Sequence, residues 1–445
     1  MNYTQLAAAD VHDMLNATGA ASIESFFSGI DPDHRVDGLL DIPAGLSEPE
    51  LLDDLGALAD RNRSTAELVC FLGAGSYDHF IPTVVDHLAS QGSFLTGYTP
   101  YQAEASQGSL QAFFEFQSMI CTLTGMEAAN ASLYDYATAA AEAVLMARAI
   151  TGRPHVVLSA AIHPDTRAVV STYIRELDLE ATRVGLSDGV TDLEAVALLI
   201  DDKTAAVVVQ SPNFFGAIED LEPLADRVHR VGALLIVGTD PISCALLRSP
   251  GSAGADIVVG DGQPLGIPMQ YGGPVLGFLS CRSHHLRKVP GRIVGMGTDR
   301  RGRRAFCLTL QTREQHIKRQ RATSNVCTNQ GLMALRATFY LAAMGKQGLA
   351  RVAGLCFDKA HYAAERIAAL DGYGLRFERP FFKEFTIQTT RDVSAILARG
   401  RARGILAGVS IGRWFDALGD CFTVAVTERR TRQQIDELID TLKSA

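Results

Sequence analysis

The chain is poor in lysine: none precedes Lys203, and only seven occur among 445 residues. It also lacks any apolar run of the about eighteen residues that a membrane-spanning helix needs, so no membrane segment is expected. The first residues, MNYTQLAAADVHDMLNATG, have no basic start and no apolar stretch, which argues against a signal peptide. They contain two Asp and no Arg, which argues against a mitochondrial transit peptide. A cytoplasmic location is the simplest prediction.

Closely spaced cysteines are also missing, since no two of the eight lie within four residues of each other. Neither a zinc site nor a disulfide scaffold is therefore predicted, and we expect no metal and buried free thiols. The composition, with 47% hydrophobic and 20% charged residues, is that of an ordinary globular protein. The length suggests one large domain and a smaller one.

Positive charge is unevenly distributed and concentrated in residues 282–321, within a chain of formal net charge −9. Such a segment is either a solvated face or a surface for an acidic partner or a phosphate group. Nucleic acid is an unfavourable partner, because the chain as a whole is acidic and the segment has almost no aromatic side chains to stack on bases.

Apolar runs without polar alternation recur through the middle of the chain and predict strands buried on both faces. These runs are residues 155–159, 205–211, 233–238, 256–260 and 275–280. Helical patterns lie between several of them. Residues 137–152 contain strong helix formers and end in glycine, and residues 221–232 have apolar positions at helical spacing. Strands that alternate with helices predict an α/β fold with a mostly parallel central sheet.

The pattern changes near Ala334, where a long helical stretch leads into a strand, a helix, a second strand and a terminal helix. We therefore predict an N-terminal helical arm at 1–90, a large α/β domain at 91–335 and a small C-terminal α+β domain at 336–445. No internal repeat and no low-complexity linker is found between these parts.

Polar side chains follow several predicted strands, at the edge where parallel sheets bind ligands. Asp240 is one; in enzymes that use pyridoxal phosphate such an acid pairs with the pyridinium nitrogen, and the alternative is a turn-forming Asp. His163 either stacks on a flat cofactor ring or is structural, and Asn213 follows another strand. Asp135 precedes a helix whose first N–H groups can receive a phosphate, or it is a plain N-cap.

A glycine- and proline-rich loop, GDGQPLGIPMQYGG at residues 260–273, follows the next predicted strand. In pyridoxal-phosphate enzymes with an acid at the position of Asp240, the lysine that binds the cofactor as an imine lies in such a loop. Here the loop has no lysine and Gln263 stands near that position. An amide nitrogen is delocalised into its carbonyl and is not a nucleophile, so the loop cannot form the imine. An imine within this chain would need a displaced lysine, such as Lys203 or Lys288.

Two further segments carry dense polar groups. Tyr98 and Tyr101 precede an amphipathic helix, and Thr323 lies with Ser324 and Asn325 in the stretch RATSNVCTNQ. The tyrosines can reach into the site of a neighbouring subunit, and the second stretch can present hydroxyls and an amide to a phosphate. Capping and turn formation are the alternative for both segments.

Eight segments, in this order along the chain, together resemble one family. They are FLGAGSYDHFIP, GYTPYQAEASQGSLQAFFEFQ, NASLYDYATAAAEA, SPNFFGAIED, GDGQPLGIP, PGRIVG, RATSNVCTNQ and FFKEF. The series resembles the N-terminal half, or α subunit, of the glycine-cleavage P-protein, the pyridoxal-phosphate-dependent glycine decarboxylase. The resemblance implies an aspartate-aminotransferase-like fold (pyridoxal-phosphate fold type I). It also implies an α2β2 assembly whose β subunit binds the cofactor covalently.

The resemblance further implies glycine as substrate and the lipoyl arm of the H-protein as acceptor of the aminomethyl group, with the isolated chain inactive. The residues expected to reach the partner's site are Tyr98, Tyr101 and Thr323. The residues expected to form a degenerate pocket in this chain are Asp135, His163, Asn213, Asp240 and Gln263.

One departure from the family pattern is Tyr136, where a glycine is expected, and its phenol should narrow any phosphate-sized cavity. The basic residues 282–321 are a candidate docking surface for the H-protein, which we expect to be acidic. The alternative to a catalytic subunit is a scaffold pseudoenzyme that stabilises the β subunit and touches no substrate.

Overall fold

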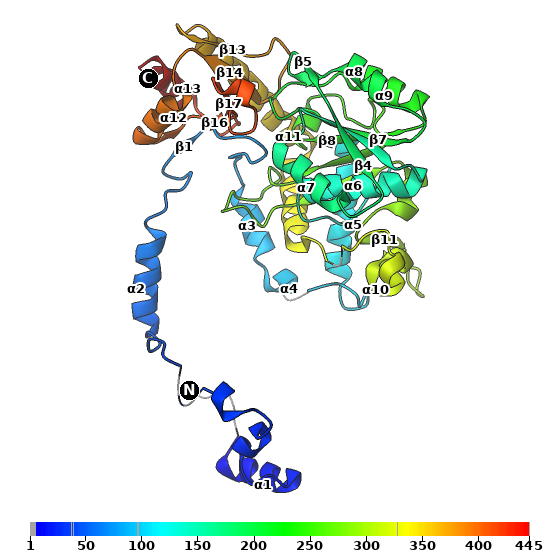
Figure 1. The fold of residues 1–445 in the computed structure, drawn as a ribbon, viewed down its shortest axis with the longest axis vertical. Coiled ribbons are helices and arrows are strands. Elements are labelled where there is room, and N and C mark those ends of the chain that lie inside the picture. Colours follow the sequence, from blue (N-terminus) through cyan, green and yellow to red (C-terminus); the bar gives the residue numbers. More distant parts are fainter. Residues whose placement is uncertain (1–5, 37, 39, 96–97, 327, 445) are drawn as a thin grey trace. The chain divides into compact units, whose positions relative to one another are not determined.

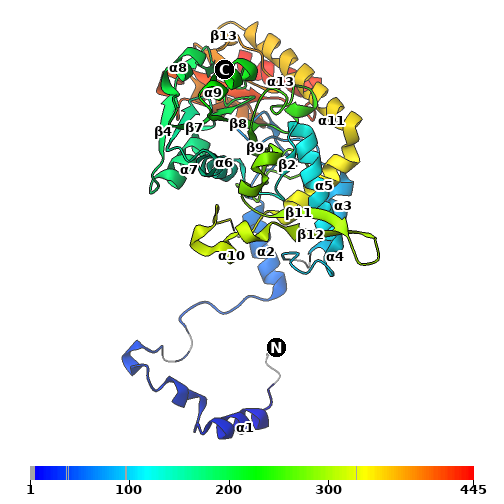
Figure 2. The same ribbon diagram turned by 90° about the vertical axis from the view of Figure 1, so that its right-hand side faces the viewer.

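Figures 1 and 2 show the computed structural model of the chain. It describes residues 6–36, 38, 40–95, 98–326 and 328–444. The beginning of the predicted arm, and Gly97 and Cys327 of the motifs quoted above, lie outside the described residues. The chain divides into two units at the boundary between Arg63 and Ser64.

The unit before this boundary is helical. Its elements are α1 (Ala8–Thr18), the 3-10 helices η1 (Ile23–Phe27) and η2 (Pro32–His34), and α2 (Glu48–Ala59). Helix α2 begins at a capping box, because the Glu50 carboxylate accepts hydrogen bonds from both the backbone N–H and the hydroxyl of Ser47. None of these four helices contains a buried residue, so local capping rather than core packing accounts for them.

The second unit is built on a sheet whose described strands have the order β2-β10-β9-β8-β7-β3-β4. The strands are β2 (Ala128–Ala129), β3 (His155–Ser159), β4 (Glu180–Val184), β7 (Thr204–Gln210), β8 (Leu234–Thr239), β9 (Ile257–Asp261) and β10 (Gly277–Cys281). Strands β9, β8, β7, β3 and β4 run parallel, and β10 is antiparallel to both neighbours. This sheet confirms the predicted mostly parallel α/β fold. The apolar pattern missed β4 because this edge strand exposes most of its side chains.

Helices cover both faces of this sheet, as Figures 1 and 2 show. On one face lie α6 (Tyr136–Thr151) and α7 (Pro164–Ile174), and on the other α5 (Gln107–Thr124), α8 (Leu193–Leu199), α9 (Leu221–Arg230) and the first half of α11 (Gly331–Ala368). Alternate residues of a strand therefore enter different cores. Val208 of β7 packs with α6 and α7, and Val207 and Val209 pack in the opposite cluster. Burial on both faces explains why these strands are continuous apolar runs.

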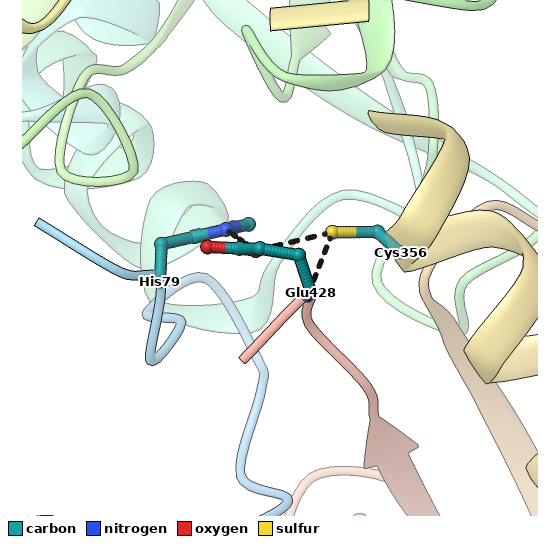
Figure 3. A group of neighbouring side chains, drawn as sticks. All are labelled: His79, Cys356 and Glu428. Carbon is teal, nitrogen blue, oxygen red and sulfur yellow. Dashed lines mark hydrogen bonds and ion pairs between the residues drawn. The ribbon is translucent and has the colours of Figure 1, made fainter. Parts of the chain in front are cut away.

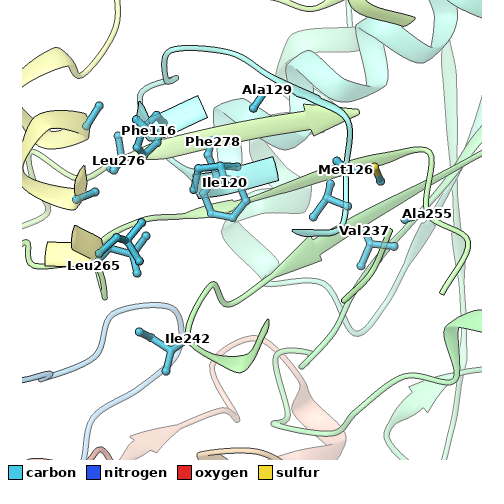
Figure 4. Packing of buried hydrophobic residues seen from close by; sticks show 14 of the residues in the cluster. Phe116, Ile120, Met126, Ala129, Val237, Ile242, Ala255, Leu265, Leu276 and Phe278 are labelled. Atoms are coloured by element: carbon cyan, nitrogen blue, oxygen red, sulfur yellow. The ribbon is translucent and has the colours of Figure 1, made fainter. Parts of the chain in front are cut away.

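Figure 4 shows part of the larger core, in which Phe116 and Ile120 of α5 lie beside Phe278 of β10. All three side chains are fully buried. Burying one such side chain contributes about 1.5–3 kcal/mol. Gln117 adds a polar attachment to the same helix, since its side-chain amide donates to the carbonyl of Val294 and accepts from the N–H of Val294. Helix α5 is thereby attached both to the sheet and to strand β11 (Ile293–Thr298), which contains Val294.

The C-terminal part forms a second, antiparallel sheet of described strands in the order β13-β14-β17-β16. Its strands are β13 (Tyr373–Leu375), β14 (Glu384–Thr389), β16 (Val409–Ser410) and β17 (Cys421–Ala425), and its helices are α12 (Val393–Ala402), α13 (Arg432–Lys443) and the second half of α11. Helix α11 is interrupted at Gly345, whose backbone is not helical. Strand β1 (Val69–Cys70) pairs in parallel with β15 (Ile405–Leu406) at this part. The predicted domain boundaries near residues 90 and 335 stay a prediction.

Short elements complete the fold. They are α3 (Thr83–Ala89), α4 (Gly92–Leu95), α10 (Gln315–Lys318), β5 (Leu186–Ser187), β6 (Val190–Thr191), β11 (Ile293–Thr298), β12 (Arg304–Thr309), η3 (Ser243–Ala245), η4 (Ser283–Lys288), η5 (Gln311–Arg313), η6 (Arg319–Arg321) and η7 (Asp416–Leu418). Within the part of the chain that the structure describes, we find no helix with the length and apolarity needed to cross a membrane.

The described cysteines are free thiols. The buried ones are Cys70, Cys281, Cys356 and Cys421, and Cys121 and Cys244 are half-buried. The expectation of buried thiols is wrong for Cys307, which is exposed. Cys307 lies on β12 of the β11–β12 hairpin, where buried and exposed side chains alternate, and its side chain falls on the open face. Cys327 is outside the described residues.

The close contact between the turn after β7 and strand β14 gives a test of the fold. Gly216 has φ +89°, and a Cβ there would overlap the backbone carbonyl of Glu384 in β14. We expect Gly216→Ala to lower the free energy of unfolding by about 3 kcal/mol or more, because both the left-handed backbone and the contact oppose it. Urea unfolding followed by circular dichroism measures this.

Gly152→Ala is the matched control. Gly152 has φ +71° at the C-terminus of α6, but no atom lies within 4 Å of its added Cβ. The expected cost is about 1 kcal/mol, from the backbone conformation alone. Equal losses for the two variants would contradict the close approach at Gly216.

Candidate functional site

The carboxyl ends of β3, β7, β8 and β9 border a cavity of about 370 Å³, which β14 and the segment after β1 complete. Parallel sheets bind ligands at this edge. The polar side chains that line it include Tyr77, Asp135, Tyr136, His163, Asn213, Asp240, Asp261, Lys383 and Glu384. Four residues predicted to share a pocket, Asp135, His163, Asn213 and Asp240, are thus together. Gln263 is not; it lines a neighbouring cavity of about 240 Å³.

Gln263 is 3% exposed, and its amide is used for structural hydrogen bonds. Its Oε1 accepts from the N–H of Tyr77 at 3.0 Å, and its Nε2 donates to the carbonyls of Tyr77 at 3.1 Å and Ile267 at 2.8 Å. A lysine can only donate and cannot reproduce this exchange. Gln263 therefore attaches the loop after β9 to the segment around Tyr77, and it brings no group into the larger cavity.

Lys383, at the start of β14, is the residue that the sequence reasoning missed. Its side chain is 2% exposed, and its Nζ lies 2.7 Å from Oδ2 of Asp240. Nζ also donates to Nε2 of His79 at 2.8 Å and lies 3.8 Å from the centre of the Tyr77 ring. An ion pair, an acceptor nitrogen and an aromatic face together compensate the burial of this ammonium. The available signal was two adjacent charges, Lys383 and Glu384, within the otherwise apolar stretch PFFKEFTI, since buried charges are almost always paired.

The contacts of Lys383 continue into a buried cluster, drawn in Figure 3. Because Lys383 donates to Nε2 of His79, the imidazole proton is on Nδ1, which donates to Oε2 of Glu428 at 2.7 Å. His79 is therefore neutral, in agreement with burial and then the Lys383 charge lowering its pKa. Although burial opposes ionisation, the hydrogen bond from His79 lowers the pKa of Glu428 to about 2. The carboxylate thus stays charged inside the protein.

Cys356 of α11 completes the cluster. Its Sγ lies 3.4 Å from Oε2 of Glu428, and it accepts the backbone N–H of Glu428 at 3.2 Å. Burial raises the pKa of the Cys356 thiol well above its ordinary value, so the thiol keeps its proton and donates it to Glu428. Side-chain atoms of His79, Cys356 and Glu428 lie within 4.8 Å of one another, as metal ligands would. With the Lys383 ammonium beside His79, their contacts are those of a hydrogen-bonded cluster.

The cavity at the strand ends does not fit pyridoxal phosphate near Asp240. In this class of enzymes the acid at that position pairs with the pyridinium nitrogen. Here the Lys383 ammonium holds the Asp240 carboxylate, and Oδ1 of Asp240 accepts the N–H of Ile242 at 3.0 Å. The loop residue Gln263 supplies no nucleophile. The acid that would pair with the ring nitrogen is therefore already bonded within the chain, and the lysine that would bind the ring as an imine is absent from the loop.

The cavity does not fit the cofactor at its phosphate end either. Tyr136, at the first turn of α6, packs against Gly238 of β8 so closely that a Cβ on that glycine would overlap the phenol. The N–H of Tyr136 is directed to Oδ2 of Asp261 at 3.3 Å, and the N–H of Thr138 donates to the Asp135 carboxylate at 2.7 Å. Groups that a phosphate would need are already bonded to carboxyl groups. Burial raises the pKa of Asp261 to about 7.

His163 and Asn213 are also held by internal contacts. His163 donates from Nε2 to the carbonyl of Ala74 at 3.0 Å, accepts the N–H of Asp165 at Nδ1, and meets the ring of Phe214 edge to face. Asn213 accepts two backbone N–H groups and donates to Glu219, which fixes the turn after β7. In the described structure these contacts support the turn and the packing rather than a ring-binding surface.

The three residues expected to reach a partner are placed apart. Tyr98 is 89% exposed and lines a cleft of about 380 Å³ in front of α5 and α11. Tyr101 is half exposed, and its hydroxyl accepts a hydrogen bond from Arg292 at 3.2 Å. Thr323 lines a different cleft, beside α6. Their surface positions are compatible with contact to another chain, and their role stays a prediction.

The strand order of the central sheet, with one antiparallel strand between β2 and β9, and the cavity at its carboxyl edge define an aspartate-aminotransferase-like protein of pyridoxal-phosphate fold type I. Residues 1–442 match the family described as the glycine cleavage system P-protein. The chain belongs to this family, which confirms the resemblance drawn from the eight segments.

Individual relatives agree with this assignment. The chain is 49% identical over 425 residues to a probable glycine dehydrogenase (decarboxylating) subunit 1 of Desulforamulus reducens, covering 96% of this chain and 95% of that protein. It is 46% identical over 445 residues to the protein of the same description from Geotalea uraniireducens, covering both completely. It also resembles the crystal structure of an inhibitor-bound glycine decarboxylase (P-protein) of the glycine cleavage system, with a TM-score of 0.92, 41% identity and full coverage of both chains.

The buried pair in the cavity can be tested by unfolding. We expect Lys383→Met to lower the free energy of unfolding by about 3–5 kcal/mol, because it leaves the Asp240 carboxylate buried without its partner. The double variant Lys383→Met/Asp240→Asn, which removes both charges, should be more stable than Lys383→Met alone. Urea unfolding of the set measures the coupling.

Lys203→Met, at an exposed lysine, is the control and should change stability by less than about 0.5 kcal/mol. If the double variant is no more stable than Lys383→Met, the loss of stability in Lys383→Met does not come from breaking the ion pair with Asp240.

Proposed function

We propose that this chain is the lysine-less α subunit of glycine decarboxylase and acts in an α2β2 heterotetramer whose β subunit binds pyridoxal phosphate covalently. The observation that carries the proposal is the Lys383–Asp240 pair in a cavity whose loop has Gln263 in place of a lysine. The chain fills its own cofactor position with side chains, so the cofactor must be on another chain. The relatives' description as subunit 1 supports a partner. The proposed location is the cytoplasm.

The N-terminal unit supports an obligate partner by its apolar surface. Phe26, Val36 and Leu52 are among its large hydrophobic side chains that are exposed. Helices α1 and α2 bury no residue, although both carry apolar side chains. A segment with apolar helix faces and no core of its own needs a covering surface, and another subunit is the natural source of one.

The proposed reaction is the decarboxylation of glycine with transfer of its aminomethyl group to the lipoyl arm of the H-protein. In this assembly Tyr98, Tyr101 and Thr323 extend toward the site of the β subunit. The basic segment 282–321 is the proposed docking surface for an acidic H-protein. Its β11–β12 hairpin supports this role, because Arg300, Arg301 and Arg304 are exposed near the hairpin turn.

Cofactor binding gives the first test of this proposal. The isolated full chain, incubated with pyridoxal phosphate, should show no visible absorbance of a bound imine, because Gln263 is not a nucleophile. After borohydride reduction, mass spectrometry should find no adduct in the isolated chain and an adduct only on the β subunit in the complex. A specific adduct on Lys203, Lys288 or Lys383 would overturn the proposal.

Kinetics of the reconstituted complex separate a contributing subunit from a scaffold. We expect Tyr98→Ala and Thr323→Ala to lower kcat/KM for glycine by about tenfold or more, because each removes a group directed to the partner's site. Size-exclusion chromatography should show an unchanged assembly. Tyr271→Ala, at a tyrosine that is also exposed, is the matched control and should leave the kinetics unchanged.

Wild-type kinetics in both the Tyr98 and the Thr323 variants would favour the scaffold pseudoenzyme, which stabilises the β subunit and touches no substrate.

A further inference from the structure

The cleft that Thr323 lines has a volume of about 840 Å³ and lies beside the C-terminal half of α6. It shares no lining residue with the cavity at the strand ends. The end of α7, Lys288 at the end of η4 and the segment 321–326 form the rest of its wall. Its volume is in the range of about 300–1,000 Å³ that is typical of small-molecule sites. Its wall includes Thr323, which is proposed above to extend toward the β subunit, and Lys288 and Arg321 of the basic segment 282–321.

The polar interior of the cleft is Glu142 of α6, which is only 4% exposed. Its Oε2 has no hydrogen-bond partner among the described residues. Burial raises the pKa of the Glu142 carboxyl to about 7, against the effect of a hydrogen bond from Ser324. A buried carboxyl oxygen without a partner is costly, so a ligand that donates a hydrogen bond to it would relieve that cost.

Three cations line the same cleft from separate elements: Arg148 of α6, Lys288 of η4 and Arg321 of η6. In the described part of the chain none of them has a side-chain hydrogen bond or an ion pair, with Glu142 or any other acid. Glu142 is the one carboxyl group in the described lining. Cations that line one cleft and have no ion pair of their own favour an anionic ligand there.

Between these charges the wall is apolar and aromatic. Leu145 and Val326 pack at the edge of the core beneath, and Tyr134 and Tyr173 also line the cleft. A ligand that meets all of these surfaces has an anionic group, a flat or apolar body and a hydrogen-bond donor for Glu142.

We propose that this cleft binds a small organic anion: its phosphate or carboxylate pairs with Arg148, Lys288 and Arg321, and an N–H or O–H group at its other end donates to Glu142. A small molecule is favoured over a segment of another protein, because the Glu142 carboxyl that it meets is 4% exposed. No residue that lines the cavity at the strand ends takes part in this site.

The test uses two phosphate probes, AMP and ribose 5-phosphate, titrated by calorimetry into the full chain in complex with its partner subunit. AMP has an exocyclic amine and an aromatic base, and ribose 5-phosphate has the phosphate and sugar alone. We expect both to bind, with AMP the tighter. Lys288→Gln and Arg321→Gln should each weaken both probes by about tenfold, as for the loss of a charge-assisted hydrogen bond.

Arg287→Gln is the matched control, because Arg287 is the exposed neighbour of Lys288 in η4 and does not line the cleft. Glu142→Leu should weaken AMP and leave ribose 5-phosphate unchanged, which distinguishes the carboxyl from the cations. Glu142→Gln keeps an acceptor and the side-chain shape, so it should retain AMP binding and guards against loss of folding in the leucine variant.

Three results would overturn the site. The first is no binding of either probe at concentrations up to about 1 mM, where even a weak specific site is occupied. The second is equal weakening by Arg287→Gln and Lys288→Gln. The third is binding to the isolated chain that disappears in the complex, which would make the cleft part of the subunit interface.

Discussion

The buried pair of Lys383 and Asp240 is the interaction on which the cavity depends. It joins β8 of the central sheet to β14 of the C-terminal sheet, and through His79 it also holds the segment after β1. An ammonium enclosed to this degree is stable only with full compensation, which here comes from a carboxylate, a neutral imidazole and an aromatic face. The same side chain thus closes the cavity and fixes three parts of the chain that are far apart in sequence.

The cluster around Lys383 also explains why the neighbouring groups have their charge states. The neutral His79 accepts a hydrogen bond from Lys383 and donates one to the Glu428 carboxylate. The same carboxylate also accepts a hydrogen bond from the Cys356 thiol. Lys359 donates to the backbone carbonyl of Glu428 at the same place. The neutral His79 therefore lies between the Lys383 ammonium and the Glu428 carboxylate, and each donor in this series of contacts has an acceptor. Such a cluster holds a single arrangement because any change of one protonation state leaves a neighbour unsatisfied.

Sequence reasoning succeeded where local pattern determines structure and failed where partners come from distant segments. The run at residues 155–159 became β3, and the glycine stop after α6 is at Gly152, because burial on two faces and helix termination are local properties. Asp240 follows β8 and lines the cavity, because the position of a residue after a buried strand is also a local property. Lys383 was missed, because its partners Asp240 and His79 are separated from it by long stretches that the sequence alone does not fold together. Gln263 was expected inside the pocket, but its backbone partner, Tyr77, turns it toward the neighbouring cavity.

The chain has replaced each attachment point of a cofactor with a contact of its own. Lys383 provides the positive charge that a pyridinium would bring to Asp240, Tyr136 fills the turn where a phosphate would bind, and Gln263 bonds to the backbone in the place of an imine lysine. These contacts act together, since an open cavity with an unpaired buried Asp240 would be costly. In the proposed assembly, an α subunit built in this way would fold without a cofactor of its own. It can then present its surface residues to a partner regardless of whether that partner is loaded.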